Sequence, residues 1–140
     1  MRSLVTALTF SAACSAFAAA PTPPSSTQIA AWSPEEINEM GPTIQKLLPV
    51  TLKGGEQAYL ASVAYENAGR NFWAGYLLVR PQIGEARSLE EFGGQYNQIR
   101  TLDDYSDSHS AVIIGGSGSG QGSSASSYSL VVFDGWSTTA

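Results

Sequence analysis

Cysteine, histidine and positive charge are all scarce in this chain of 140 residues. It has one cysteine, one histidine and seven basic residues, and its net charge is −5. One thiol cannot form a disulfide within the chain, and Cys14 and His109 together cannot supply the several ligands of a usual zinc site. The scattered basic residues argue against binding to nucleic acid or to an anionic membrane. No apolar run beyond residue 20 is long enough to span a bilayer, so we expect no membrane insertion.

Residues 1–18 are typical of an export signal. Arg2 is a short basic segment, residues 4–10 are apolar, and Ala16–Ala18 is a small-x-small cleavage site. We therefore expect a secreted protein, or a periplasmic one in a Gram-negative source, that keeps no cysteine after cleavage. Lipidation of Cys14 is the alternative, but residues 11–13 lack the large aliphatic residue usual before a lipidated cysteine. The remaining chain of about 122 residues is long enough to form a core without disulfides.

The next segment favours an extended spacer followed by helices. Residues 19–31 are rich in proline, serine and threonine, a composition that blocks regular structure and predicts a spacer. Ser33 and Pro34 then form a strong helix start, because serine is a good N-cap and proline suits the first helical position. We predict a helix from Pro34 to Met40 and a second short helix over residues 43–48.

The middle of the chain favours a β-hairpin. Apolar residues alternate over 59–65 and over 72–79, with a turn-forming segment between them. Residues 72–79 are apolar on both faces, which predicts a strand that is covered on both sides. The alanine-rich stretch Glu56–Ala68, ending before Gly69, leaves a helix open as the alternative for the first of these strands.

Two further strands are predicted over residues 110–114 and 128–133. Glycine and serine dominate residues 115–127 between them, which predicts a flexible loop because ordering such residues costs entropy and buries little. The resulting fold class is α+β, with short N-terminal helices packed on an antiparallel sheet of about four strands in two hairpins. Residues 32–140 would form this single small domain.

No complete catalytic or cofactor motif is present. Gln121 stands where a dinucleotide or phosphate-binding loop would need glycine or lysine. The acidic segment 103–109 fails the EF-hand pattern, although looser extracellular calcium loops leave Ca²⁺ as the one cofactor considered. A serine hydrolase would need His109 as its base, and no nucleophile elbow accompanies it. We therefore assign no catalytic, cofactor-binding or metal-binding residue.

Aromatic and acidic residues at the edges of predicted elements are the remaining candidates for ligand contact. Tyrosine and tryptophan offer flat faces with a polar tip, which suits sugars and protein partners. The candidate ligand-binding residues are Trp32, Tyr105, Asp107, His109 and Trp136. The sequence thus favours a small, effector-like, non-enzymatic secreted module that binds a cell-wall glycan or a surface or host protein. The alternatives are a small extracellular hydrolase that uses acidic residues and an inhibitor of secreted enzymes.

Overall fold

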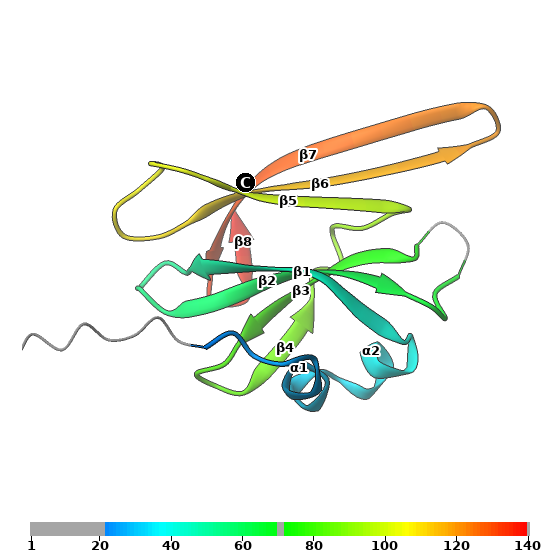
Figure 1. Ribbon diagram of the computed structural model, residues 1–140. Helices are drawn as coiled ribbons and strands as arrows, with labels where there is room; N and C mark the ends of the chain where they lie inside the picture. Colours follow the sequence, from blue (N-terminus) through cyan, green and yellow to red (C-terminus); the bar gives the residue numbers. More distant parts are fainter. Residues whose placement is uncertain (1–21, 70–71, 140) are drawn as a thin grey trace, which may run out of the picture.

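Two four-stranded antiparallel sheets and two short helices make up the structure (Figure 1). The computed structural model describes residues 22–69 and 72–139, so the predicted export signal and Cys14 lie outside the described residues. The first sheet has the order β1-β2-β3-β4 and the second the order β5-β6-β7-β8. The strand bounds are β1 Pro42–Thr51, β2 Gln57–Tyr65, β3 Ala74–Arg80, β4 Glu85–Ser88, β5 Tyr96–Leu102, β6 Ala111–Gly120, β7 Ser123–Asp134 and β8 Ser137–Thr139.

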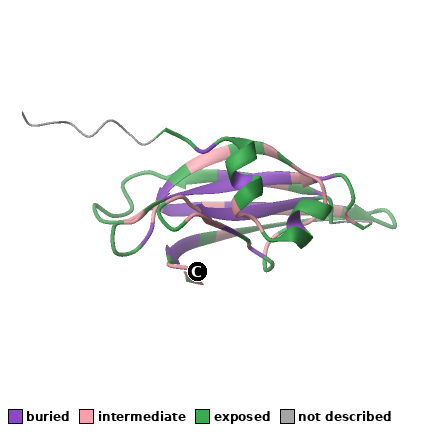
Figure 2. Ribbon diagram, turned by 90° about the horizontal axis from the view of Figure 1, so that it is seen from below, coloured by how far each residue is buried: buried purple, intermediate pink, exposed green. Residues whose placement is uncertain are grey.

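The elements stack as helices, first sheet and second sheet. Helices α1 (Ser26–Trp32) and α2 (Glu35–Glu39) lie across one face of the first sheet, as Figure 2 shows. Ile29 and Ile37 from these helices join a core with Leu77 and Val79 of β3. The opposite face of β3 packs against the second sheet. The side chains of this second core are Val50, Leu52, Ala58, Leu60, Tyr76, Leu78, Leu89, Ile99, Val112, Ile114, Val131 and Phe133.

The predicted fold class is confirmed in its coarse features. The chain is mostly antiparallel sheet, and its few short helices lie in the N-terminal part. The prediction of one sheet of about four strands was too small, because a second sheet of equal strand number covers the first. The hairpin predicted over residues 59–79 is present as β2 and β3, and Glu56–Ala68 is strand rather than helix through most of its length. β3 is buried on both faces, as expected, but it begins at Ala74, and Phe72 and Trp73 of the predicted strand precede it and are exposed.

The spacer predicted over residues 19–31 was wrong from Ser26 onward, where α1 begins. Ser25 caps this helix: its hydroxyl accepts the N–H of Gln28 at 3.2 Å, and the Gln28 side chain accepts the N–H of Ser25 at 2.9 Å. This reciprocal pair satisfies two backbone donors and offsets the weak helix propensity of the segment. Ser33, the expected N-cap of the next helix, instead ends α1 by donating its hydroxyl to the carbonyl of Ile29 at 2.7 Å. The predicted helix at residues 34–40 is present as α2.

The helix predicted over residues 43–48 is instead part of β1. Gly41 has φ +64°, which turns the chain out of α2, and Pro42 then opens a strand that pairs with β2 from Tyr65 back to Gln57. β1 is an edge strand of its sheet. An edge position tolerates proline, because on the open side no neighbouring strand needs the N–H that proline lacks. Pro42 and Pro49, which in the sequence are compatible with the ends of a short helix, therefore both lie within this strand.

The flexible loop predicted over residues 115–127 was also wrong. β6 and β7 run through this segment as a continuous hairpin and pair from Val112 with Val131 to Gly120 with Ser123. Gln121 and Gly122 form a two-residue turn with φ values of 50° and 80°, as in the type I′ turns that match the twist of a hairpin. The strands predicted at 110–114 and 128–133 are present as the inner parts of β6 and β7.

Candidate functional site

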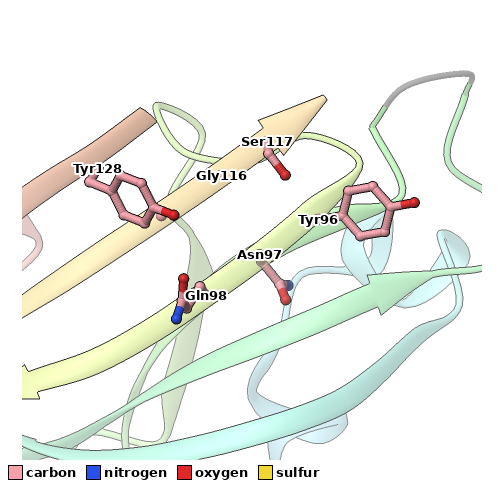
Figure 3. A pocket seen from close by; sticks show the side chains of 7 residues that line it. Tyr96, Asn97, Gln98, Gly116, Ser117 and Tyr128 are labelled. Carbon is pink, nitrogen blue, oxygen red and sulfur yellow. The ribbon is translucent and has the colours of Figure 1, made fainter. Parts of the chain in front are cut away.

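The outer face of the second sheet, turned away from the first sheet, carries two exposed tyrosines. The strand register places Tyr96 of β5 opposite Ser117 of β6, and it places Gly115 between Gln98 of β5 and Tyr128 of β7. Tyr96 is 64% exposed and Tyr128 is 66% exposed. Between their rings lies a shallow hollow of about 100 Å³ (Figure 3). We call this hollow the tyrosine groove; it is lined by Tyr96, Asn97, Gln98, Gly115, Gly116, Ser117 and Tyr128.

Glycine at position 115 allows the ring of Tyr128 to lie flat against the sheet. A Cβ at this position would stand 2.7 Å from the ring, which is too close for any side chain. Gly115 is itself buried, so the ring and the neighbouring strands together cover it. The Tyr128 ring therefore lies close to the backbone of β6 and forms one wall of the tyrosine groove.

A second hollow of about 210 Å³ continues from Tyr128 along the same face. It is lined by Gln98, Arg100, Ile113 and Tyr128. Arg100 lies opposite Ile113 in the register, and Leu130 of β7 follows in the same row. The face thus combines flat aromatic and aliphatic surfaces with an amide and a guanidinium that donate hydrogen bonds.

The floor of the groove is held from below by Tyr76 of β3. Its hydroxyl accepts the N–H of Gln98 at 2.9 Å and donates to the carbonyl of Gly115. Burial raises the pKa of Tyr76, while the hydrogen bond from Gln98 opposes this shift. The hydroxyl therefore stays protonated at neutral pH and fixes the two backbone segments beneath the tyrosine groove.

Three of the five residues predicted from the sequence lie together in a different place. Tyr105, Asp107 and His109 line a hollow of about 500 Å³ beside the β5–β6 connection. The Ser108 hydroxyl is 2.9 Å from Nδ1 of His109, and the Tyr105 ring lies edge-on to the imidazole at 5.9 Å. We call this region the acidic loop hollow; it is a polar surface with one exposed aromatic ring.

The predicted calcium option concerns the same loop. Asp103, Asp104 and Asp107 all have exposed side chains. Within residues 22–69 and 72–139, no three side chains of the histidine, cysteine, aspartate and glutamate types gather closely enough to hold a metal ion. Calcium binding therefore stays a prediction from the sequence.

The two predicted tryptophans lie apart from this loop and from each other. Trp32, at the end of α1, is half-buried against the helix-side core, near Gly84. Trp136 is half-buried beside the core between the sheets, and the guanidinium carbons of Arg80 and Arg87 lie 4.7 and 4.3 Å from its ring centre. The chain's own arginines therefore already contact the ring that was expected to meet a ligand.

Neither Tyr96 nor Tyr128 is among the candidate ligand-binding residues predicted from the sequence. Residues 96–102 were not predicted as a strand, although Tyr96, Gln98 and Arg100 alternate with the inward-facing Asn97 and Ile99. That alternation was the available local signal. Tyr96 and Tyr128 are far apart in the sequence, so only the register of β5, β6 and β7 shows that they lie on the same face of the sheet.

Comparisons with known proteins add no family. No protein-family model, curated protein or solved structure matches the chain. Among the described residues, no helix has the length and apolar character needed to cross a membrane.

Proposed function

We propose that this protein is a non-catalytic, exported module that binds a glycan through the tyrosine groove. The observation that carries the proposal is the pair of largely exposed rings, Tyr96 and Tyr128, that line the same shallow hollow on one face of the second sheet. Exposed aromatic residues that share one open face are typical of a contact surface. Export is taken from the predicted signal at residues 1–18.

The chemistry of the face suits a sugar polymer. A sugar ring has apolar C–H faces that stack on the electron-rich faces of tyrosine rings, and its rim of hydroxyls needs hydrogen-bond partners. Gln98 supplies an amide with both donor and acceptor atoms, Ser117 a hydroxyl, and Arg100 a guanidinium that can only donate. These groups surround the rings on the same face.

The shape of the face favours an extended ligand over a small enclosed one. Two strand spacings and two residues separate Tyr96 from Tyr128, so their Cα atoms lie about 12 Å apart. This separation exceeds one sugar ring, so contact with both tyrosines requires an oligosaccharide. The hollows of about 100 and 210 Å³ are smaller than the pockets that enclose small molecules.

Retention on insoluble polysaccharides tests the proposal. The protein is mixed with cellulose, chitin, xylan and β-glucan particles, and the fraction left in solution gives the affinity. We expect retention on at least one polymer. Tyr96→Ala and Tyr128→Ala should each weaken it about 30-fold, because truncating a central aromatic contact costs roughly 2 kcal/mol.

The matched control is Tyr105→Ala, which removes an equally large ring that is 47% exposed in the acidic loop hollow. This variant should bind like the unmodified protein. Loss of retention in Tyr105→Ala alone would move the site to the acidic loop. Failure of the unmodified protein to bind any polymer would contradict glycan recognition and favour a protein ligand.

The two alternative functions give different outcomes in the same assay. A hydrolase that uses acidic residues would release soluble sugars from one of the polymers. An inhibitor would leave the polymers intact and slow a secreted enzyme that degrades them. Neither outcome is expected if the tyrosine groove serves binding alone.

A further inference from the structure

One edge of β7 is left uncovered along most of its length. On its first edge β7 pairs with β6 from Ser123 to Val131, and on its second edge it pairs with β8 only over Val132–Asp134. No other strand of the described chain pairs with that second edge. Figure 1 shows the β6–β7 hairpin extending past the end of β5.

The register shows which backbone groups this edge presents. The N–H of Gln95 donates to the carbonyl of Ser117. The side-chain amide of Gln95 donates to the carbonyl of Ser119 and accepts the N–H of Ser119. Ser117 and Ser119 therefore direct their backbone groups away from β7. Residues directly opposite in an antiparallel pair share this orientation, so Ser126 and Ser124 direct theirs away from β6. The same alternation extends to Tyr128 and Leu130.

This edge lacks the features that normally prevent strands from pairing between molecules. Natural edges are protected by charged side chains, by proline or by bulges. Residues 110–133 contain no charged residue and no proline, and the β6–β7 register is uninterrupted. Ser124, Ser126 and Tyr128 are exposed along it.

We propose that β7 pairs antiparallel with β7 of a second copy of this chain, around a two-fold axis at Ser127. In that register Ser124 faces Leu130 of the other copy and Ser126 faces its Tyr128. Each of these residues then donates its N–H and accepts at its carbonyl. A two-fold axis makes the edge complementary to itself, as in other symmetric dimers.

The charge distribution marks this edge as the place where two copies can meet with the least repulsion. The chain carries a net charge of −5, so two copies repel each other at most orientations. Residues 110–133 form the longest stretch of described sequence without a charged side chain, and the pairing brings together only this stretch. The central pair of Ser127 residues would have Cα atoms about 4.5 Å apart, a spacing that small side chains fit.

The axis stands perpendicular to the sheet, so the outer faces of both copies point the same way. If the tyrosine groove binds glycans as proposed above, the dimer presents two grooves on one surface. The pairing itself does not depend on that function, and the experiments below contain no glycan.

A cysteine at the axis tests the register directly. In a full chain that carries Cys14→Ser, Ser127→Cys should form a disulfide-linked dimer in high yield on mild oxidation, because the Cα spacing lies within disulfide reach. The matched control is Ala125→Cys, on the same strand and equally exposed. Its two copies would lie about 14 Å apart and should stay monomeric on a non-reducing gel. Equal cross-linking of both variants, or none of Ser127→Cys, would overturn the proposal.

Sedimentation equilibrium over a wide range of concentration tests the association without a cross-link. Ser126→Pro removes an edge N–H that β6 does not use, and it should weaken the dimer at least tenfold. Ser126→Ala keeps that N–H and should dimerise normally. Unchanged thermal unfolding of the diluted variants checks that both are folded. A chain that stays monomeric at all concentrations contradicts the proposal. That result would also be obtained if the edge pairs with an extended peptide of another protein rather than with a second copy.

Discussion

Tyr76 of β3 and Asn97 of β5 cross between the two sheets in opposite directions. The hydroxyl of Tyr76 accepts the N–H of Gln98 at 2.9 Å and donates to the carbonyl of Gly115. Gln98 and Gly115 are register partners of β5 and β6, so the hydroxyl from the first sheet bridges a strand pair of the second.

Asn97 makes the reciprocal contact. Its side-chain amide donates to the carbonyls of Val63 at 3.0 Å and Gly75 at 3.1 Å. Val63 and Gly75 are register partners of β2 and β3. Apolar packing between sheets has little directional preference, whereas the hydrogen bonds of these two polar side chains can form in only one relative alignment of the two sheets. They therefore fix how the tyrosine groove lies over the first sheet.

The first prediction concerns the hydroxyl of Tyr76. Tyr76→Phe should lower the free energy of unfolding by about 1–3 kcal/mol, because it leaves buried backbone groups without their partner. The control is Tyr65→Phe. The Tyr65 hydroxyl is buried and makes no hydrogen bond of good geometry in the described part of the chain, so its removal should cost less. Urea unfolding of both variants measures the difference, and equal losses would contradict the assigned role of Tyr76.

Alkaline pH should destabilise the protein through the same residue. Burial raises the pKa of Tyr76 above the ordinary value of 10.0, and it raises that of Tyr65 as well. Above pH 10 the unfolded chain loses tyrosine protons that the folded chain retains, so stability falls as the pH rises. Below pH 10 this contribution is fully present. Urea unfolding from pH 8 to 11 should show the decline, and Tyr76→Phe should show a shallower one.

Gly115→Ala should damage the tyrosine groove while Gly120→Ala should not. A Cβ at position 115 would overlap the Tyr128 ring, whereas one at position 120 meets no atom within 4 Å. We expect Gly115→Ala to displace the ring and to reduce polysaccharide retention about tenfold, roughly 1.4 kcal/mol. Gly120→Ala should bind normally. Retention assays on both variants, with unfolding curves to confirm folding, make the comparison. Full binding by Gly115→Ala would show that the ring position is not needed.

The local sequence was sufficient for the two strands that are buried on both faces. β2 and β3 were predictable because Tyr59, Ala61 and Val63 alternate and because β3 is apolar on both faces. β1 was not predictable, because Pro42 and Pro49 flank the segment predicted as a helix over residues 43–48, and only the place of β1 at a sheet edge makes them compatible with a strand. The position of β1 at the edge depends on the order of all the strands in the sheet, and no local sequence pattern indicates it.

The predictions for the Gly/Ser segment and for the ligand-binding site were wrong for a related reason. The strand pairing of residues 115–127 continues from a core formed by Val112, Ile114 and Val131, so cooperative extension outweighs the entropy that the composition costs. Tyr105, Asp107 and His109 were found together because they are close in sequence. Tyr96 and Tyr128 meet only through the register of three strands, and a single sequence does not specify that register.

The last prediction concerns acid stability and the pair formed by Glu56 and Arg80. The Arg80 guanidinium bonds both carboxylate oxygens of Glu56, at 2.9 and 2.6 Å, and both side chains are largely covered. The hydrogen bond from Arg80 is the main cause that holds the pKa of Glu56 below its ordinary value of 4.5. The stabilisation is therefore fully present above pH 4.5 and is lost as the pH falls through the lower pKa of the folded state.

Glu56→Gln should lower the free energy of unfolding by about 1–2 kcal/mol at pH 7, because a charge-assisted contact is lost. The matched control is Glu85→Gln, since Glu85 and Arg87 form an exposed pair at 3.0 Å that should contribute less than about 0.5 kcal/mol. Urea unfolding at pH 7 and pH 3 separates the cases. The deficit of Glu56→Gln should be smaller at pH 3 than at pH 7, because below pH 4.5 Glu56 of the unfolded chain binds a proton and the pair contributes less to stability. A deficit that is equal at both pH values would show that Glu56 acts through packing rather than through its charge.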